Sequence, residues 1–506
     1  MSMESKILQL PETWVAVNLG DFVENDKGKK PKNESKTQTA VHHLPYVDIQ
    51  TFEENIVRTW TDGIGCRLCS ETDFLMVWDG SRSGLVGKGV NGALGSTLVR
   101  IDFPSMVNDY AYYFLQSKYQ QINTRAKGTG TPHVDPDLLW NYKFPIPPLA
   151  EQHRIVAKIE ELFSELDKGI DNLKTALAKL KVYRQAILKH AFEGKLTSQW
   201  REQNKDKLES ASALKERIET ERAIYYQKQL ADWQAAGQKG SKPKASKPFE
   251  LLTNQELAEL PLLPKGWSWF KVGNLCDVVR GGSPRPAGDP KLYGGNIPFL
   301  KVADITATSE PYLKSYSHTI TAAGLKKTRQ IKPNTLLLSN SGATLGVPKI
   351  CLISATMNDG VAAFLGLPHN TLLYHYYFWE SKTEFLRNID QGAAQPNLNT
   401  DLIKETIIPI SSELEIIAVI DKLQLALSEV DQLDQTITTA LQQSEALRQS
   451  ILKKAFSGTL VAQNADDEPA VVLLARIKTE KAVQSITTKP RKTKKMRAYL
   501  SQLKRM

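Results

Sequence analysis

The sequence lacks the segments that would place a protein in or across a membrane. No apolar run in its 506 residues approaches the ~18 residues that a membrane-spanning helix requires. Residues 1–14 contain no basic segment followed by an apolar one, so a signal peptide is not expected. Four cysteines are too few for a disulfide framework in a chain of this length. These absences favour a cytoplasmic protein.

Sequence motifs of catalytic sites are also missing. The segment GSRSGLVGKG at 80–89 resembles a phosphate-binding loop, but Gly89 follows Lys88 where that loop requires Ser or Thr. FPIPP at 144–148 lacks the Asn or Asp that precedes the two prolines of amino-methyltransferases. There is no HExxH, and the eight histidines follow no Ser-His-Asp order. We therefore expect a non-catalytic chain and reject a self-sufficient methyltransferase-nuclease.

One pair of cysteines, Cys66 and Cys69, has the spacing of half a zinc site. A structural zinc ion needs four ligands, and no second pair follows at the spacing of a zinc finger. His42 and His43 could complete such a site only by coming close in space. Two ordinary thiols are the simpler interpretation, and no metal site is expected.

The body of the chain also lacks net charge. The whole sequence carries +10, and residues 476–506 hold eleven Lys or Arg and one acid, Glu480. The remaining residues are therefore neutral overall. The basic tail is either a solvated arm or a contact for a polyanion, and the charge of the rest does not by itself indicate nucleic-acid binding.

An internal repeat is the strongest positive signal in the sequence. RQAILKHAFEGKL at 184–196 matches RQSILKKAFSGTL at 448–460 in nine of thirteen positions, at an offset of 264. The same offset aligns YYFLQSK at 112–118 with YYFWESK at 376–382. Nearer the start of each copy, LPETW at 10–14 aligns with LPKGW at 263–267, at an offset of 253. The chain thus consists of two copies of one unit, and the second copy carries eleven more residues.

Each copy predicts a globular segment followed by a long helix. Short apolar runs bounded by Gly, Asn and Ser predict strands and turns, and segments 107–126 and 371–390 predict a helix in each globular part. Apolar residues then recur at every third or fourth position, which is typical of a coiled-coil stripe. The stripe residues are Val156, Ile159, Phe163, Leu166, Ile170, Leu173, Leu177 and Leu180 in the first copy, and Ile420, Leu423, Leu427, Val430, Ile437 and Leu441 in the second. Gly194 and Gly458 are expected to end these helices.

Each apolar stripe must be buried, and the helix of the other copy is the obvious partner. If the helices pair antiparallel, the two globular segments lie at opposite ends of a rod. The expected fold class is α+β: two globular domains of mixed α/β type separated by two long antiparallel coiled-coil helices, in a pseudo-two-fold internal repeat. A duplicated enzyme whose helices form only a domain interface is the alternative.

The expected boundaries follow from these patterns. They are 1–149 for the first globular domain, 150–196 for the central long helix, 197–263 for a charged helix and flexible linker, 264–410 for the second globular domain, 411–460 for the C-terminal long helix, and 461–506 for a basic C-terminal tail. Residues 470–482 also resemble 211–223, so the segment after each long helix is itself repeated.

The order of these segments resembles the DNA-specificity (S) subunit of type I restriction-modification enzymes. PIPPLAEQHRIVAKIEELFSELD followed by LKVYRQAILKHAFEGKL carries the similarity, which is strongest at 145–196 and 409–460. The loops GTGTPHVDPDLL at 128–139 and GAAQPNLNTDLI at 392–403 precede the helices, and the second is closer to the family pattern. The resemblance extends from Leu10 to about Ile486.

This resemblance implies that the globular domains are target-recognition domains, each reading one half of a bipartite site in double-stranded DNA. It also implies that the helices set the spacing between the halves and dock two modification (methyltransferase) subunits, which direct adenine methylation. Restriction and translocase subunits would complete the complex. The resemblance implies no cofactor in this chain, with S-adenosylmethionine, ATP and Mg in the partner subunits. The alternative is a non-catalytic scaffold whose heads bind RNA or protein.

Base recognition in the major groove requires forked hydrogen-bond donors and acceptors, which the loops of both domains contain. The candidates in the first domain are Ser81, Arg82, Ser83, Lys88, Arg125, Lys127, Thr129 and Thr131; those in the second are Arg280, Arg285, Asn340, Ser341, Gln391, Gln395 and Asn397. Each could instead be a solvated loop residue. The stripe residues are the candidates for helix pairing and subunit docking. RNA binding would favour exposed aromatic residues, whereas Tyr112, Tyr113, Tyr376 and Tyr377 are expected in the core.

Overall fold

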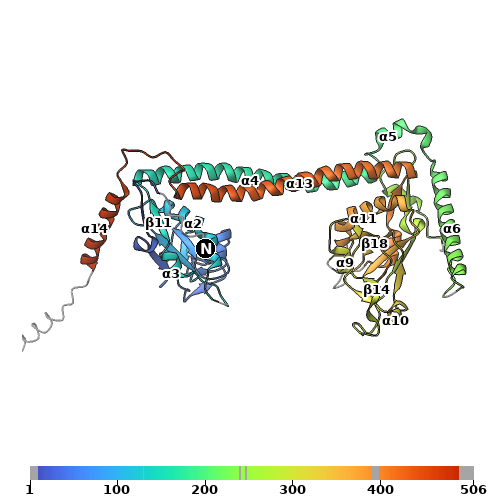
Figure 1. Ribbon diagram of the computed structural model, residues 1–506, viewed down its shortest axis with the longest axis horizontal. Coiled ribbons are helices and arrows are strands. Elements are labelled where there is room, and N and C mark those ends of the chain that lie inside the picture. The colour runs from blue at the N-terminus through green and yellow to red at the C-terminus, as the bar shows by residue number, and fades with distance from the viewer. Residues whose placement is uncertain are drawn as a thin grey trace, which may run out of the picture. The chain divides into compact units, whose positions relative to one another are not determined.

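The structure is a computed structural model, and it describes residues 10–488 except 129, 239–240, 246–247, 343 and 389–397; the side chains of 481–488 are not described. The chain divides into two compact units. Unit 1 comprises residues 1–174 with 438–506, and unit 2 comprises residues 175–437. Each unit contains one globular head and a part of both long helices (Figure 1). No described helix has the length and apolarity needed to cross a membrane.

Head 1 is built from three small sheets. The first pairs β1 (Val15–Asn18) with β11 (Lys143–Ile146). The second has the order β2 (Glu24–Lys27), β10 (Leu98–Asp102), β7 (Phe74–Val77), β8 (Val86–Lys88). The third has the order β3 (Glu34–Ser35), β5 (Trp60–Thr61), β4 (Leu44–Val47), β9 (Gly92–Leu94), β6 (Leu68–Cys69). The helices are α1 (Ile49–Glu54), α2 (Asn108–Thr124) and α3 (Pro136–Trp140).

Head 2 repeats this arrangement. The first sheet pairs β12 (Ser268–Lys271) with β22 (Ile407–Ile410). The second has the order β13 (Asp277–Arg280), β21 (Val361–Leu365), β18 (Thr335–Ser339), β19 (Pro348–Cys351), β15 (Tyr312–Leu313). The third has the order β16 (Thr319–Ile320), β14 (Tyr293–Leu300), β20 (Ala355–Met357), β17 (Arg329–Ile331). The helices are α8 (Val272–Leu275), α9 (Val302–Thr306), α10 (Ala322–Leu325), α11 (Leu372–Arg387) and α12 (Thr400–Glu405).

The helix expected in each globular segment is α2 in head 1 and α11 in head 2. Their tyrosines hold the same contacts, because the Tyr110 hydroxyl donates to the Pro145 carbonyl at 2.9 Å and the Tyr374 hydroxyl to the Pro409 carbonyl at 2.7 Å. Tyr113, Tyr376 and Tyr377 are buried, as expected, and Tyr112 is half-buried. These rings belong to the cores and do not form an exposed stacking surface.

The long helices α4 (Leu149–Phe192) and α13 (Glu413–Phe456) pack together in both units, and they run antiparallel. In unit 1 the start of α4 and the end of α13 share one apolar cluster, in which Ile159 and Phe163 join Leu452 and Phe456. In unit 2 the end of α4 and the start of α13 share the other, in which Leu188 joins Leu423. The expected fold class is therefore confirmed, including the pairing of the helices.

The apolar stripes are buried most completely near the heads. The buried stripe residues are Val156, Ile159, Phe163, Ile420, Leu423, Leu427 and Val430. The half-buried ones are Leu166, Ile170, Leu173, Leu177, Leu180, Ile437 and Leu441. The stripe therefore packs the helices against each other and against the heads, and its central part retains exposed apolar surface.

Repeated arginines and aspartates join the long helices. Arg448 of α13 pairs with Asp167 of α4 in unit 1, and Arg184 of α4 pairs with Asp431 of α13 at 2.6 Å in unit 2. Each pair is related to the other by the offset of 264 found in the sequence. Arg184 also contacts Glu380 of α11 at 3.5 Å. This accounts for the arginine that begins both copies of the RQ-ILK motif.

The glycines that follow the long helices have the left-handed backbone expected of helix ends, with φ of +67° at Gly194 and +75° at Gly458. A Cβ atom at Gly458 would lie 2.5 Å from Cγ of Pro11, and one at Gly194 would lie 2.9 Å from Cγ of Pro264. The two repeated motifs, LP--W and RQ-ILK-AF-G-L, thus meet at both places. In each unit the helix end comes from one copy and the head from the other.

A further helix follows each long helix and covers the head that the long helix has reached. After the short α5 (Ser198–Gln203), α6 (Ala211–Ala235) packs on head 2 through Leu214 and Ile218. α14 (Ala470–Thr488) packs on head 1 through Leu473 and Ile477. α7 (Asn254–Glu259) lies in the linker that leads back to head 2.

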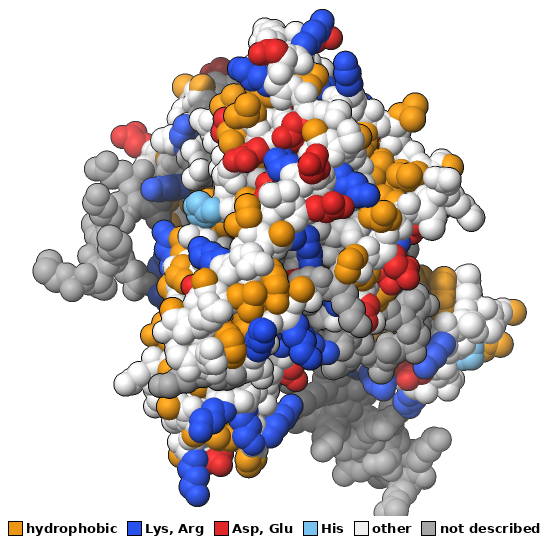
Figure 2. Space-filling view, turned by 90° about the vertical axis from the view of Figure 1, so that its right-hand side faces the viewer, with side chains coloured by type: hydrophobic (Ala, Val, Ile, Leu, Met, Phe, Trp, Pro, Cys, Tyr) orange, Lys and Arg blue, Asp and Glu red, His pale blue; other side chains and the backbone are white. Residues whose placement is uncertain are grey.

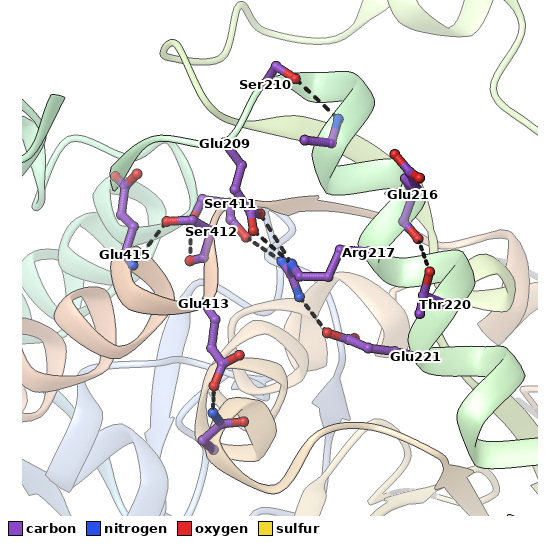
Figure 3. Close-up of polar contacts among 12 residues, drawn as sticks. Glu209, Ser210, Glu216, Arg217, Thr220, Glu221, Ser411, Ser412, Glu413 and Glu415 are labelled. Carbon is purple, nitrogen blue, oxygen red and sulfur yellow. Dashed lines mark hydrogen bonds and ion pairs between the residues drawn. The ribbon is translucent and has the colours of Figure 1, made fainter. Parts of the chain in front are cut away.

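An arginine clamp fastens α6 in place (Figure 3). Arg217 pairs with Glu209 at 3.1 Å and Glu221 at 2.7 Å, and it donates to the Ser411 carbonyl just before α13. Arg476 of α14 forms the corresponding pair with Glu468, which lies just before that helix. The repeat therefore extends to the packing of the appended helices.

Candidate nucleic-acid interface

Most of the described candidate residues lie at one edge of the second sheet of each head. In head 1, Lys27 at the end of β2 is paired with Val99 of β10, and Val77 at the end of β7 is paired with Leu98. Because β10 is antiparallel to both neighbours, β2 and β7 end where β10 begins. We call this the loop edge of head 1. The loop edge of head 2 is formed in the same way by Arg280, Ser339 and Val361.

A turn after β7 presents the first candidates of head 1. Gly80 begins this turn. The side-chain amide of Asn123 on α2 donates to the carbonyls of Ser81 and Ser83 at 2.9 and 3.0 Å. Gly84 closes it with φ of +91°, and a Cβ atom there would lie 2.5 Å from Ile122. Ser81 and Arg82 are consequently exposed at the loop edge, where Arg82 pairs with Glu53 of α1 at 3.3 Å.

The loop between α2 and α3 lies beside this turn. The Gly80 amide donates to the Pro132 carbonyl at 2.7 Å, and the Val134 amide donates to the Trp78 carbonyl at 2.9 Å. Lys127 bonds His133 through two backbone hydrogen bonds, which hold the loop closed. The structure therefore brings Lys127 and Thr131 to the same edge as Ser81 and Arg82.

Charges at this edge are largely balanced in pairs. Lys27 contacts Asp79 at 2.7 Å, and Lys127 contacts Asp135 at 3.0 Å. The hydrogen bond from Lys127 is the largest cause that lowers the pKa of Asp135, so this carboxylate stays ionised at neutral pH. Arg82 is balanced by Glu53. The donors of Lys27, Arg82 and Lys127 are thus pre-positioned with their charges balanced.

Three other candidates of head 1 behave differently. Lys88 is paired in register with Phe74 at the start of β7, so it lies at the opposite edge of the sheet, where it pairs with Asp109 and covers the Tyr112 ring. Ser83 is fully buried, so its hydroxyl could contact a base only if the turn opened. Arg125 is exposed at the end of α2. Thr129 lies outside the described residues.

In head 2 the candidates gather around the turn between β20 and β21. Arg280 donates to the Asp359 carbonyl, and Arg285 approaches the Asp359 carboxylate at 4.0 Å. The backbone N–H of Asn340 donates to the Gly360 carbonyl at 3.0 Å, and Ser341 therefore lies beside this turn. Gln391, Gln395 and Asn397 lie outside the described residues.

Asn340 is itself fully buried, and both polar atoms of its side chain lack a hydrogen-bond partner in the described part of the chain. It occupies the place that Trp78 has in head 1, because the Leu398 amide donates to its carbonyl as Val134 donates to Trp78. Its side chain would reach a base only after a rearrangement of the loop edge.

The described parts of the two loop edges share backbone hydrogen bonds although their side chains differ. Gly84 donates to the Val77 carbonyl at 2.7 Å, and Gly346 donates to the Ser339 carbonyl at 2.8 Å. At the equivalent position of this turn, head 1 has Arg82 and head 2 has Thr344. A constant frame with variable side chains is suited to reading two different ligand surfaces.

Sequence reasoning missed the lysines that follow β2. The segment KGKKPK at 27–32 passes directly over the loop edge, because the amides of Gly28 and Lys29 donate to the Leu98 and Leu94 carbonyls. The run of four lysines was the available signal. It does not match the forked donors that suit bases, because lysine carries a point charge.

Within the described residues no three His, Cys, Asp or Glu side chains are grouped as metal ligands. Cys69 is buried, and burial is the main cause that raises the pKa of its thiol to about 11. Its Sγ donates to the Val90 carbonyl at 3.1 Å. The thiol is therefore protonated at neutral pH and packs as an ordinary core side chain.

Comparison with known proteins matches residues 11–175 and 264–447 to the type I restriction modification DNA specificity domain. The EcoDI specificity subunit of a type I restriction enzyme from Escherichia coli is 21% identical over 495 residues, which cover 94% of this chain and 96% of that protein. The MjaVIII specificity subunit from Methanocaldococcus jannaschii is 32% identical over 191 residues, which cover 36% of this chain and 45% of that protein.

A solved structure shares the fold. It is described as the structural basis of complex assembly and conformational transition of the type I R-M system. It superimposes with a TM-score of 0.61 and 18% identity, over 89% of this chain and 100% of the solved one.

Proposed function

Because this chain belongs to the family of type I restriction-modification DNA specificity subunits, we propose that heads 1 and 2 each recognise one half of a bipartite site in double-stranded DNA. In these enzymes catalysis resides in other subunits, which use S-adenosylmethionine and ATP, and the specificity subunit carries no cofactor. The observation that carries the proposal is the duplicated loop edge, whose described backbone hydrogen bonds recur in both heads while its side chains differ.

In head 1 the base-reading side chains are those exposed at the loop edge: Ser81, Arg82, Lys127 and Thr131. Arg82 can donate two parallel hydrogen bonds to a guanine once it leaves Glu53. In head 2 the corresponding group is Arg280, Arg285 and Ser341. The undescribed Thr129, Gln391, Gln395 and Asn397 belong to the same proposal on sequence grounds alone.

The paired helices set the distance between the two half-sites. Each has 44 residues, which corresponds to roughly 66 Å at 1.5 Å per residue. A fixed helix length would make the number of unread base pairs between the half-sites a property of the helices. The heads would determine only the sequences of the halves.

Two modification subunits dock on the helices, and they direct the methylation of adenine. Tyr183 of α4 and Leu447 of α13 support two matched sites, because they are related by the offset of 264 and are 56% and 51% exposed. Exposed apolar residues at repeated positions suit two copies of one partner. Restriction and translocase subunits join the same complex. Chromosomal DNA as the substrate implies a cytoplasmic location.

An exchange of heads tests the proposal. Residues 11–144 would be replaced by the corresponding segment of a relative with a different DNA site, and the methylated motif would be mapped genome-wide. We expect one half of the motif to change and the other to persist with the same spacing. A chimera that altered both halves, while binding its partners normally, would contradict independent reading by the two heads.

A further inference from the structure

The segment after β2 contains three exposed lysines, and the residues between and beside them, Gly28, Pro31 and Asn33, are fixed against the head. Gly28 lies so close to the turn before β10 that a Cβ atom would be 2.1 Å from the Gly95 carbonyl oxygen. Pro31 is buried, and the Asn33 amide donates to Asp62 at 2.7 Å. The exposed side chains between these anchors are Lys29, Lys30 and Lys32.

These lysines differ from the other cations of the loop edge. Lys27, Arg82 and Lys127 each pair with a carboxylate within 3.3 Å. Lys30 reaches Glu34 only at 3.8 Å. Lys29 and Lys32 have no ion-pair partner among the residues that the structure describes. Their charge is therefore available to an anion outside the chain.

Head 2 has the same backbone here without the lysines. Gly281 takes the place of Gly28, with 2.2 Å from a Cβ atom to the Asn358 carbonyl oxygen, and the buried Pro284 takes the place of Pro31. Gly282 then stands where head 1 has Lys29. A side chain at Gly282 is hindered, because its Cβ would lie 3.0 Å from the carbonyl oxygen of Lys327.

The segment that covers Gly282 supplies lysines of its own. It follows α10 and is fastened by a hydrogen bond from Thr328 to the Met357 carbonyl at 2.8 Å, the same carbonyl that accepts from the Gly282 amide. Lys326 and Lys327 are exposed and have no ion-pair partner in the described part of head 2. Figure 2 shows Lys and Arg side chains gathered at the lower end of unit 2, where Figure 1 places α10.

We propose that Lys29, Lys30 and Lys32 in head 1, and Lys326 and Lys327 in head 2, are two equivalent clamps for the phosphates of duplex DNA. The clamps occupy the same place beside each loop edge but come from different parts of the sequence. This inference rests on the proposed function and adds to it a division of labour. The exposed residues of the loop edge read bases, and the lysines beside them, which lack a close ion pair, hold the sugar-phosphate backbone.

The chemistry favours phosphate over base edges for these side chains. An ammonium group is a point charge on a flexible stem, which suits a phosphate oxygen better than the forked pattern of a base. Each phosphate that is neutralised releases condensed counterions, so such contacts appear as a salt dependence of affinity that is independent of sequence. Base-reading residues would change the preferred sequence instead.

The test measures affinity against salt concentration for a duplex of arbitrary sequence, with the full-length chain purified together with the subunits it assembles with. We compare the wild type with Lys29→Gln/Lys32→Gln and with Lys326→Gln/Lys327→Gln. Each pair should reduce the slope of log affinity against log salt by about 1.8, at 0.9 per phosphate contact. Between 50 and 200 mM salt the wild type should then lose about 12-fold more affinity than either variant.

Lys205→Gln/Lys207→Gln removes the same charge from exposed lysines after α5 and serves as the control, with the wild-type slope expected. Any methylation that the two clamp variants retain should fall on the wild-type motif. An unchanged slope in either clamp variant, or an altered motif, would overturn the assignment of that clamp. Failure of the wild type to bind duplex DNA at 50 mM salt would instead overturn the proposed function and this inference with it.

Discussion

His375 is a buried histidine on α11, and burial lowers its pKa to about 4. Above pH 6.5 the ring is neutral in the folded and unfolded states, so it has no effect on stability. As pH falls from 6.5 to 4, the unfolded chain binds a proton that the folded head does not. Unit 2 should therefore lose up to about 3 kcal/mol of stability across this range. Head 1 has Ala111 at the corresponding position and should not share this loss.

Thermal unfolding of His375→Leu at pH 7.5 and pH 4.5 measures this contribution. The drop in melting temperature on acidification should be smaller in the variant than in the wild type. His369→Leu, which replaces an exposed histidine just before α11, should behave as the wild type. Equal acid sensitivity of the His375→Leu variant and the wild type would show that another group causes the loss.

Arg82 provides a test of base reading by a single side chain. Arg82→Ala should relax the preference for one base pair in one half-site, at a cost of about 1–3 kcal/mol in discrimination. The measurement is selection of bound duplexes from a library randomised at both half-sites. Glu53→Gln removes the partner of Arg82 without removing the guanidinium, so it should keep the preference. A uniform loss of affinity in Arg82→Ala, with the selected sequence unchanged, would assign Arg82 to the phosphate backbone.

The sequence predicted the structural environment of residues in the repeated helical motifs. It did not predict the environment of residues whose position depends on how the strands pair. Gly194 and Gly458 could be placed because a helix end favours glycine with a left-handed backbone. The tyrosines of α2 and α11 could be placed because a helix fixes which positions share a face. Lys88 could not, because the antiparallel pairing of β7 and β8 carries it to the edge opposite Ser81 and Arg82. Ser83 is a loop candidate in the sequence, but its side chain is buried in a turn held by Asn123.

At the scale of elements, the junction between a helix end and a head is the feature most open to mutation. At Gly458 the backbone is left-handed, and Pro11 and Trp14 pack against it. Gly458→Ala should destabilise unit 1 by about 1–3 kcal/mol, because it adds backbone strain and displaces Pro11. Gly194→Ala should act on unit 2 in the same way through Pro264.

Gly169 gives the matched control, since it lies inside α4 and a Cβ atom there would have no atom within 4 Å apart from the adjoining backbone of its own helix. Gly169→Ala should raise stability by up to about 1 kcal/mol through helix propensity alone. Urea unfolding followed by circular dichroism distinguishes the three variants. If Gly458→Ala were as stable as Gly169→Ala, the contact with Pro11 would not hold head 1 on the helices.

The sequence predicted the long helices but not the pairing of the strands. The long helices follow from an apolar period that persists over many turns, and their partner follows from the repeat. The sheets do not, because most of their strands are short and are assembled from segments far apart. In β4 and β9, Tyr46 is paired in parallel with Ala93, and no local pattern indicates such a pairing. The position of Lys326 and Lys327 beside Gly282 likewise cannot be predicted from the sequence, because the fold brings the segment after α10 next to the end of β13.

At the scale of the whole molecule, the proposed role of the helices predicts a change in the DNA site when their length changes. Four residues inserted in α4 after Thr175, together with four in α13 after Ile437, would add about 6 Å to both helices and keep their apolar stripes nearly in phase. At about 3.4 Å per base pair, the gap between the half-sites should grow by one or two base pairs. The halves themselves should be unchanged.

Genome-wide mapping of the methylated motif checks this expectation. The matched control carries Gly169→Ala in α4, which leaves the helix length unchanged and should preserve the gap. An active insertion variant with the wild-type gap would show that the helices do not set the spacing.

Unit 1 is formed by two separate parts of the chain, and this delays its folding during synthesis on the ribosome. The apolar cluster of head 1 includes Leu452, Phe456 and Leu473, more than 300 residues after the last strand of that head. At about 5–20 residues per second, head 1 must wait roughly 15–60 s for the segment that closes it. Unit 2 is continuous and can close first. A translation product that ends before Leu452 therefore lacks the residues that complete the core of head 1, and the apolar surface left exposed there favours aggregation and chaperone binding.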